Sequence, residues 1–280
     1  MTIRPVPFTP KSREEAKRSL IRRDTLWRNR DFLTLWTGQT VSLIGSQITP
    51  IALPLLAVLN LQATPGQMAL LRALSFSPAI LLGLVIGAWV DRLRRRTLMI
   101  GADLGRALLL LTLPIAAALG LLRLDLLFVV AFLLGSLDLV FGAAYGAFLP
   151  VVTPAEQLIE ANSRLATSAA ASAVAGPGLA GLLVQWFGAP LAMLGDALSF
   201  LASACSLVLI RTPEPAPPGR EHRQPLWREI AAGLRVLRDS RILFAFVASS
   251  MTLDVFWNAL MAVYFLYLTR SLGLPAGAFG

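Results

Sequence analysis

The stretch Gly87-Ala-Trp-Val-Asp-Arg-Leu-Arg-Arg-Arg96 carries four arginines within its last five residues and lies between two long apolar runs. These runs, residues 68–90 and 97–120, are each long enough to cross the hydrocarbon core of a bilayer, which takes about 20 residues of helix. Four guanidinium groups cannot lie in hydrocarbon, so the chain must turn in water between the runs. The stretch therefore predicts a hairpin that joins two membrane-spanning helices.

The composition also favours a membrane protein. Hydrophobic residues make up 56% of the 280 residues and charged residues only 15%, whereas soluble domains carry about 25% charged residues. The net charge of +9 would suit a nucleic-acid-binding protein, but the cations follow the membrane topology instead, so we expect no nucleic-acid partner. The single cysteine, Cys205, lies in an apolar run, and the single histidine, His222, lies in a polar segment. We therefore expect no disulfide, no metal site and no cofactor.

Seven apolar runs in the sequence reach spanning length. They cover residues 32–58, 68–90, 97–120, 124–148, 165–187, 189–210 and 242–268. Between the sixth and seventh runs, the proline-rich segment 212–220 predicts an extended linker, and residues 226–241 repeat leucine and isoleucine at helical spacing among arginines. The second of these segments predicts an amphipathic helix along the membrane surface.

Lysines and arginines are distributed unevenly between the two sides of the predicted membrane. Of the 25 cations, 21 lie in the leader, the basic hairpin, the fourth connection or the long linker, whereas Arg123 and Arg270 lie on the opposite side and Arg72 and Arg106 lie inside spans. The positive-inside rule then predicts a cytoplasmic N-terminus. We expect a cytosolic tail over residues 1–31, a six-helix transmembrane domain over 32–211, a cytosolic linker over 212–241, and a seventh helix over 242–280 that begins a second half.

Two motifs give the chain a resemblance to the major facilitator superfamily, and within it to bacterial exporters of the macrolide-efflux and enterobactin-export type. The family's loop motif between helices 2 and 3, Gly-x-x-x-Asp-Arg-x-Gly-Arg-Arg, is matched by Gly87, Asp91, Arg92, Arg95 and Arg96, with Arg94 at the second glycine. The family's helix 5 antiporter motif, Gly-x-x-x-Gly-Pro-x-x-Gly-Gly, is matched by Gly176, Pro177 and Gly181.

The resemblance covers the chain from Trp27 onward and implies an all-α, polytopic membrane helix bundle with two six-helix halves, each built from 3+3 inverted repeats. This chain would hold the first half and helix 7, within the bacterial inner membrane. In agreement with inverted repeats, Asp103 and Asp196 lie at similar depths in the third and sixth runs.

Both motifs also have a physical rationale. A carboxylate at Asp91 can cap the positive end of a neighbouring helix, while the arginines hold the hairpin in the aqueous, anionic-lipid zone. Such a latch can break and reform between two states; the alternative is a stop signal that only sets topology. Gly176, Pro177 and Gly181 give helix 5 a bend and a small-residue face, which another helix can approach closely. That face serves either antiport or ordinary packing.

Ionisable residues inside the spans carry the most functional information, because each costs roughly 2.5 to 3.5 kcal/mol at mid-membrane. They are Arg72, Asp103, Arg106, Asp138, Asp196 and Asp254. Asp103 and Arg106 stand three residues apart and predict a local, structural ion pair.

Asp138 and Asp254 lie near the middle of helices 4 and 7, which the resemblance implies line a central cavity. They are candidates for carrying protons or binding a cationic group, with Gln39 and Asn258 as neutral contacts. The alternative for each acid is pairing with Arg106 or burial in the neutral form.

We interpret the sequence as a secondary transporter that exports a bulky organic compound or drug by alternating access, driven by protons. Its partners would be the lipid bilayer, a small-molecule substrate and protons. The sequence carries no phosphate-binding glycine loop and no metal-ligand cluster, so we do not expect an enzyme. Two alternatives stay open: an ion channel, and a truncated, non-transporting membrane protein that needs a second chain to supply the missing half.

Overall fold

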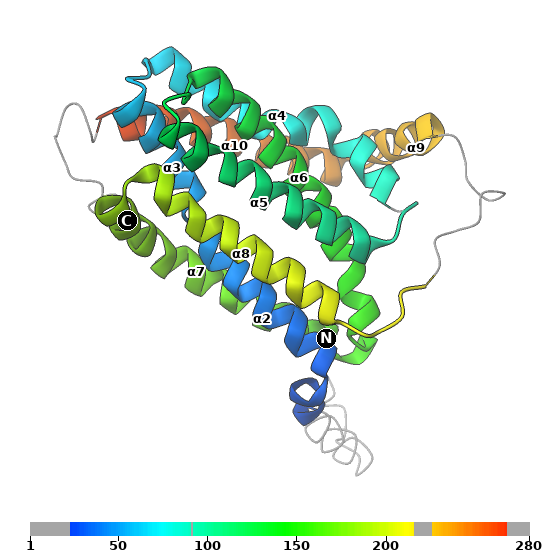
Figure 1. Cartoon of the computed structure of the whole chain (residues 1–280). Helices are drawn as coiled ribbons and strands as arrows, with labels where there is room; N and C mark the ends of the chain where they lie inside the picture. Colours follow the sequence, from blue (N-terminus) through cyan, green and yellow to red (C-terminus); the bar gives the residue numbers. More distant parts are fainter. Residues whose placement is uncertain (1–22, 91, 216–225, 268–280) are drawn as a thin grey trace, which may run out of the picture.

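The structure, a computed structural model, describes residues 23–90, 92–215 and 226–267. All elements within these residues are helical (Figure 1). In chain order they are η1 (Arg23–Arg28), α2 (Arg30–Gly45), α3 (Thr49–Leu55), η2 (Leu56–Asn60), α4 (Pro65–Val90), α5 (Arg95–Ala118), α6 (Leu124–Val152), η3 (Ala155–Gln157), α7 (Leu158–Phe187), α8 (Ala189–Leu209), α9 (Leu226–Asp239) and α10 (Arg241–Leu266). Seven helical stretches of the described residues are long and apolar enough to cross a membrane. The predicted all-α fold with seven spans is thereby confirmed.

Helix 1 departs from the continuous helix that its apolar run predicts. It consists of α2, a turn over residues 46–48, α3 and the π-helical segment η2. Two prolines contribute to the interruption, because Pro50 and Pro54 lack the amide hydrogen that a continuous α-helix needs. Helix 1 is therefore a broken helix. The remaining spans correspond to α4, α5, α6, α7, α8 and α10, which we call helices 2 to 7.

The ends of several helices follow from local sequence. Asn29 caps α2, since its side-chain oxygen accepts a hydrogen bond from the backbone amide of Phe32 at 3.1 Å. Between α7 and α8, Gly188 adopts a positive φ of 80°, which glycine tolerates and which reverses the chain within one residue. α7 begins at Leu158, seven residues before the apolar run predicted from residue 165. The helix is longer than that run because its first two turns include polar residues, which an apolar pattern does not detect.

The packing of the first six helices has the symmetry expected of an inverted repeat. Helix 3 packs against helix 6, helix 1 against helix 6, helix 4 against helix 3, helix 2 against helix 4, and helix 5 against helix 1. Exchanging helices 1, 2 and 3 with helices 4, 5 and 6 maps this set of contacts onto itself. The contact between helices 5 and 6 is the exception, since helices 2 and 3 form no comparable contact. Helix 7 packs against helix 2 and α9. The observed contacts therefore agree with two three-helix repeats.

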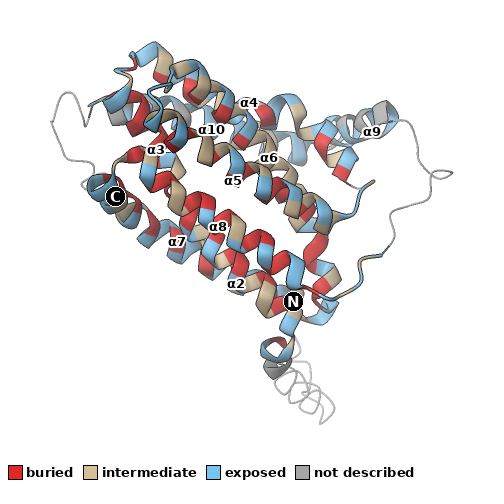
Figure 2. Ribbon diagram, viewed as in Figure 1, coloured by how far each residue is buried: buried red, intermediate tan, exposed pale blue. Residues whose placement is uncertain are grey.

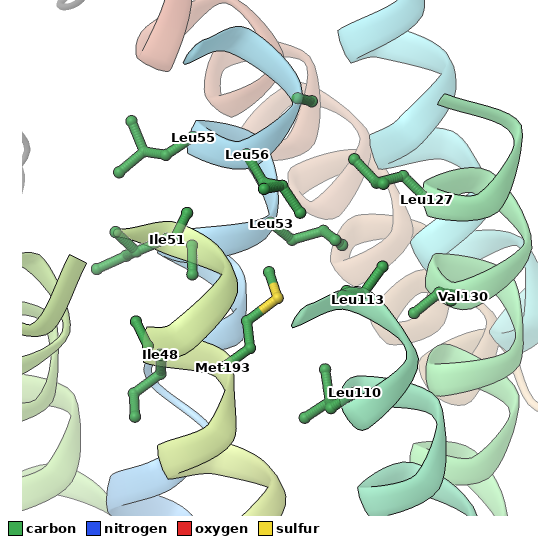
Figure 3. Close-up of a cluster of buried hydrophobic side chains, with 14 of the residues drawn as sticks. Ile48, Ile51, Leu53, Leu55, Leu56, Leu110, Leu113, Leu127, Val130 and Met193 are labelled. Carbon is green, nitrogen blue, oxygen red and sulfur yellow. The ribbon is translucent and has the colours of Figure 1, made fainter. Parts of the chain in front are cut away.

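The apolar side chains form two buried clusters inside this bundle, while many others are exposed. Figure 2 shows buried and exposed residues along the helices of the bundle. The first cluster joins the α3 end of helix 1 to helices 3, 4 and 6; Figure 3 shows Leu53, Leu110, Val130 and Met193 within it. On helix 2, by contrast, Ile80 and other large apolar residues are exposed. An outer surface of this kind is what a lipid-facing helix requires.

Candidate functional site

Arg106 of α5 lies at the centre of a buried cluster of charged and aromatic side chains. Its guanidinium donates to Asp138 of α6 at 2.8 Å and to Asp103, one turn earlier on α5. The same group lies over the ring of Phe141 at 4.3 Å and over the ring of Phe200 of α8 at 4.2 Å. Helices 3, 4 and 6 thus surround one cation with two carboxylates and two aromatic faces.

The two carboxylates of this cluster differ in their access to solvent. Asp103 is fully buried, whereas the side chain of Asp138 is 58% exposed. With both carboxylates ionised, one arginine leaves the cluster with a net charge of −1, and the exposed carboxylate is that of Asp138. A proton on Asp138, or a cationic ligand beside it, would bring the cluster to neutrality. Asp138 is therefore the carboxylate of the cluster that can be reached from outside the bundle.

Asp138 also lines a cavity of about 360 Å³ between helices 1, 2 and 4. Thr49 and Pro54 form part of the helix 1 wall, and Arg72 and Phe76 contribute from helix 2. The lining is mostly apolar, with Asp138 and Arg72 as its charged residues. Its volume falls at the lower end of the range for small-molecule sites, roughly 300 to 1,000 Å³.

Gln39 lies in a polar seam that leads from helix 1 to the same cluster. It is buried, and its amide donates to the hydroxyl of Ser203 on α8 at 3.0 Å. The side chain of Ser203 also interacts with that of Asp103. Gln39, Ser203 and Asp103 therefore form a polar path toward Arg106. Sequence reasoning missed Ser203, Phe141 and Phe200, because contacts between helices depend on their rotation, which the apolar pattern does not fix.

The described side chains of helix 7 do not line this cavity. The residues that line the cavity come from helices 1, 2 and 4, and Asp254 is exposed on α10, which packs against α4 and α9. The side chain of Asn258 lies outside the described residues. Of the four residues predicted for the substrate and proton pathway, the structure brings Asp138 to the cavity and Gln39 to the seam behind it.

The basic hairpin is tied to the end of helix 6 and to the linker that follows. The backbone amides of Arg95 and Arg96, which begin α5, donate to the carboxylate of Glu214 at 2.6 and 3.2 Å. The guanidinium of Arg96 donates to the carbonyls of Leu207 and Val208 at 2.7 and 2.6 Å. Glu214 thus caps the positive end of helix 3, and Arg96 caps the negative end of helix 6.

The remaining residues of the predicted latch give less information. Asp91 lies outside the described residues. Gly87 has open space where a Cβ atom would be, and the backbone amide of Arg92 donates to Trp89. The sequence analysis did not predict a role for Glu214. Its position between two prolines, shortly after helix 6, could have indicated an acidic residue held near the ends of the helices.

A second set of bonds joins the start of helix 1 to the same end of the bundle. The carboxylate of Asp31 accepts from the backbone amides of Arg211 at 3.2 Å and Thr212 at 2.7 Å. The side-chain amide of Asn29 donates to the carbonyl of Val152, at the end of helix 4, at 2.8 Å. We call this end, where α2 and α5 begin and α6 and α8 end, the basic end.

Gly176 of the helix 5 motif provides a close contact with helix 1. A Cβ atom at this buried position would lie 2.2 Å from Cγ of Gln47, in the turn that interrupts helix 1. Pro177 lies inside α7, and Gly181 is buried. The small residues of the motif therefore let the broken part of helix 1 pack directly against helix 5.

Comparison with known proteins identifies the family. The sequence pattern of the Major Facilitator Superfamily matches residues 35–280. Macrolide efflux protein A of Streptococcus pyogenes is 30% identical over 216 residues, which are 76% of this chain and 53% of that protein. The uncharacterized MFS-type transporter YfiS of Bacillus subtilis is 29% identical over 186 residues, 66% of this chain and 43% of that protein. The chain spans about half the length of these relatives.

The match also bears on the expected chemistry. Among the described residues, no three His, Cys, Asp or Glu side chains are grouped so that they could hold a metal ion. The relatives are named as efflux and transport proteins, which agrees with the expectation that the chain is not an enzyme. Because the family pattern covers most of the sequence and the helices form the bundle expected for it, this multi-pass membrane protein belongs to the major facilitator superfamily of transporters.

Proposed function

We propose that this chain supplies the first half of a proton-coupled exporter of a bulky organic compound that works by alternating access. One observation carries the proposal: Asp138 is exposed to a cavity and is also hydrogen-bonded to the buried Arg106. Such a carboxyl can exchange a proton or a ligand with the aqueous phase while its charge is balanced from within the bundle. The efflux function named for Macrolide efflux protein A supports the direction of transport.

Proton coupling follows from the charge of the Arg106 cluster. When Asp138 is ionised, the cluster carries one excess negative charge and attracts a cationic group into the cavity. When Asp138 is protonated, Arg106 and Asp103 neutralise each other and that attraction is lost. Proton and cationic substrate therefore compete for one site, and such competition is sufficient for exchange across a membrane when the site faces each side in turn.

The size of the cavity favours assembly with further helices. At about 360 Å³, the space between helices 1, 2 and 4 encloses only part of a bulky molecule. A second half, supplied by the remainder of a longer chain or by a partner chain, would form the opposite wall. The hydrogen bonds at the basic end would hold the first half together while it rocks against the second. By the positive-inside rule, the basic end faces the cytoplasm.

The test is substrate-induced proton release in lipid vesicles that contain this chain together with a chain carrying further helices of the family, with a macrolide as the substrate. Asp138→Asn is expected to abolish the release. Asp125→Asn is the matched control, because Asp125 is on the same helix but exposed, in a surface pair with Arg123 at 3.4 Å. The control is expected to release protons as the parent does. Asp254→Asn tests in the same assay whether the helix 7 acid takes part.

Unchanged proton release in Asp138→Asn would contradict the proposed role of this acid. Absence of transport by the chain alone, restored when a chain carrying further helices of the family is co-expressed, would favour the alternative of a membrane protein that needs a partner.

A further inference from the structure

The interruption of helix 1 rests on a buried carboxyl of helix 6. Thr49, the first residue of α3, donates its hydroxyl to Asp196 of α8. Gly45, the last residue of α2, approaches the same helix so closely that a Cβ atom there would lie 2.1 Å from the hydroxyl of Ser199 and 3.3 Å from the carboxylate of Asp196. The two halves of helix 1 thus meet at Asp196.

The surroundings of Asp196 suit both of its protonation states. The residue is 1% exposed, and its side chain is hydrogen-bonded by the hydroxyls of Thr49 and Ser199, the latter at 3.3 Å. A hydroxyl can donate to a carboxylate or accept from a carboxylic acid. The charged groups that act on Asp196 from neighbouring helices are Arg106 and Asp138.

The other elements packed against α8 bring no charge close to Asp196. α3 contains no ionisable residue, and the charged residues of α2 and of α7 lie in the segments of these helices nearest the basic end. A proton can therefore be gained or lost at Asp196 without breaking a direct ion pair.

The backbone at the interruption is arranged as a hinge. The amides of Gln47 and Ile48 bond to carbonyls three residues back, at 3.2 and 2.8 Å, in place of the α-helical spacing of four. A mid-helix stretch with this tighter pattern often marks a functional hinge. Thr49 also lines the cavity that contains Asp138, so a displacement at the hinge changes the wall of that cavity.

We propose that Asp196 is a second proton-binding carboxyl of this transporter and that its protonation sets the conformation of the hinge in helix 1. The reason is chemical: a carboxylate accepts the hydrogen bond that joins it to Thr49, whereas a carboxylic acid can donate it, so the bond between α3 and α8 reverses with the proton. This inference rests on the proposed proton-coupled function, and it assigns a separate site to a second proton.

The experiment reports on the hinge directly. A nitroxide spin label is placed at Ile44, which is 42% exposed, in a Cys205→Ala background of the full chain in lipid nanodiscs, and its mobility is recorded against pH. The spectrum is expected to change with pH in the parent and to stay fixed in Asp196→Asn. The titration is expected to persist in Asp138→Asn and in Ser206→Ala, a control on the same buried face of α8.

A titration that persists in Asp196→Asn, or that is absent from the parent, overturns the proposal. Should Asp196→Asn fail to fold, Thr49→Val keeps the carboxyl and removes its hydroxyl partner. That variant is expected to displace the midpoint of the titration, and an unchanged midpoint also overturns the proposal. The readout needs neither substrate nor transport, so its failure is distinguishable from a failure of the Asp138 assay.

Discussion

Arg106 carries a charge inside the bundle at a tolerable cost because its partners come from three helices. Replacing it by leucine would leave Asp103 buried without a counter-ion, and removing one partner of a buried pair costs about 3 to 5 kcal/mol. We expect Arg106→Leu to lower the thermal unfolding temperature in detergent strongly. The double variant Arg106→Leu/Asp103→Asn should recover much of that loss, since it also removes the uncompensated charge.

Arg123→Leu is the matched control for this prediction. Arg123 is exposed and pairs with Asp125 at 3.4 Å on the surface, where ion pairs contribute little. The unfolding temperature of the Arg123→Leu variant should stay close to that of the parent protein. An equal loss of unfolding temperature in both arginine variants would contradict this prediction, because it would show that the buried ion pair contributes no more than the exposed one.

The sequence predicts part of this cluster and not the rest, for a physical reason. Asp103 and Arg106 stand three residues apart on one helix, and that spacing alone places them on one face. The bond from Arg106 to Asp138 and the ring of Phe200 depend on how helices 3, 4 and 6 are rotated about their axes. Rotation is set by packing of all side chains at once, so a pattern of apolar residues cannot determine it.

Among the elements, helix 1 and helix 6 approach each other closely through small residues. A Cβ atom at Gly45 would lie 2.1 Å from the hydroxyl of Ser199. Gly45→Ala should therefore force the two helices apart and destabilise the protein by about 1 to 3 kcal/mol. Gly142→Ala on α6 is the matched control, because nothing lies within 4 Å of its added methyl group.

For Gly142→Ala we expect no loss, and a gain of up to about 1 kcal/mol, since alanine favours the helix. Unfolding in denaturant, followed by circular dichroism in the same detergent, compares the two variants. If the Gly45→Ala variant were as stable as the Gly142→Ala variant, the result would contradict the close approach of helices 1 and 6 at Gly45.

The position of the spans is predictable at this scale, whereas the interruption of helix 1 is not. Length and apolar content identify all seven spans, because hydrocarbon imposes one requirement on every helix that crosses it. Pro50 and Pro54 are visible in the sequence, but prolines are tolerated inside spanning helices, as at Pro78 and Pro114. What makes helix 1 break is the combination of two prolines with contacts to Asp196 and Gly176.

For the whole molecule, the inverted packing of helices 1 to 3 and 4 to 6 places Asp103 and Asp196 on the symmetry-related helices 3 and 6, and both are buried. Only Asp103 has an arginine one turn away. The two repeats therefore place a carboxyl in equivalent helices and give it different partners. A difference of this kind lets one acid serve a structural pair while the other is free to take a proton.

The orientation of the molecule is the last prediction, and it rests on the distribution of lysines and arginines. The basic hairpin, with Arg94, lies at the basic end, and Thr64, in the connection between helices 1 and 2, lies at the opposite end of helix 2. Both residues are exposed. In a Cys205→Ala background, a membrane-impermeant thiol reagent added to intact bacterial cells should label Thr64→Cys and spare Arg94→Cys. Labelling of Arg94→Cys alone would invert the topology, since 21 of 25 cations would then lie outside the cell.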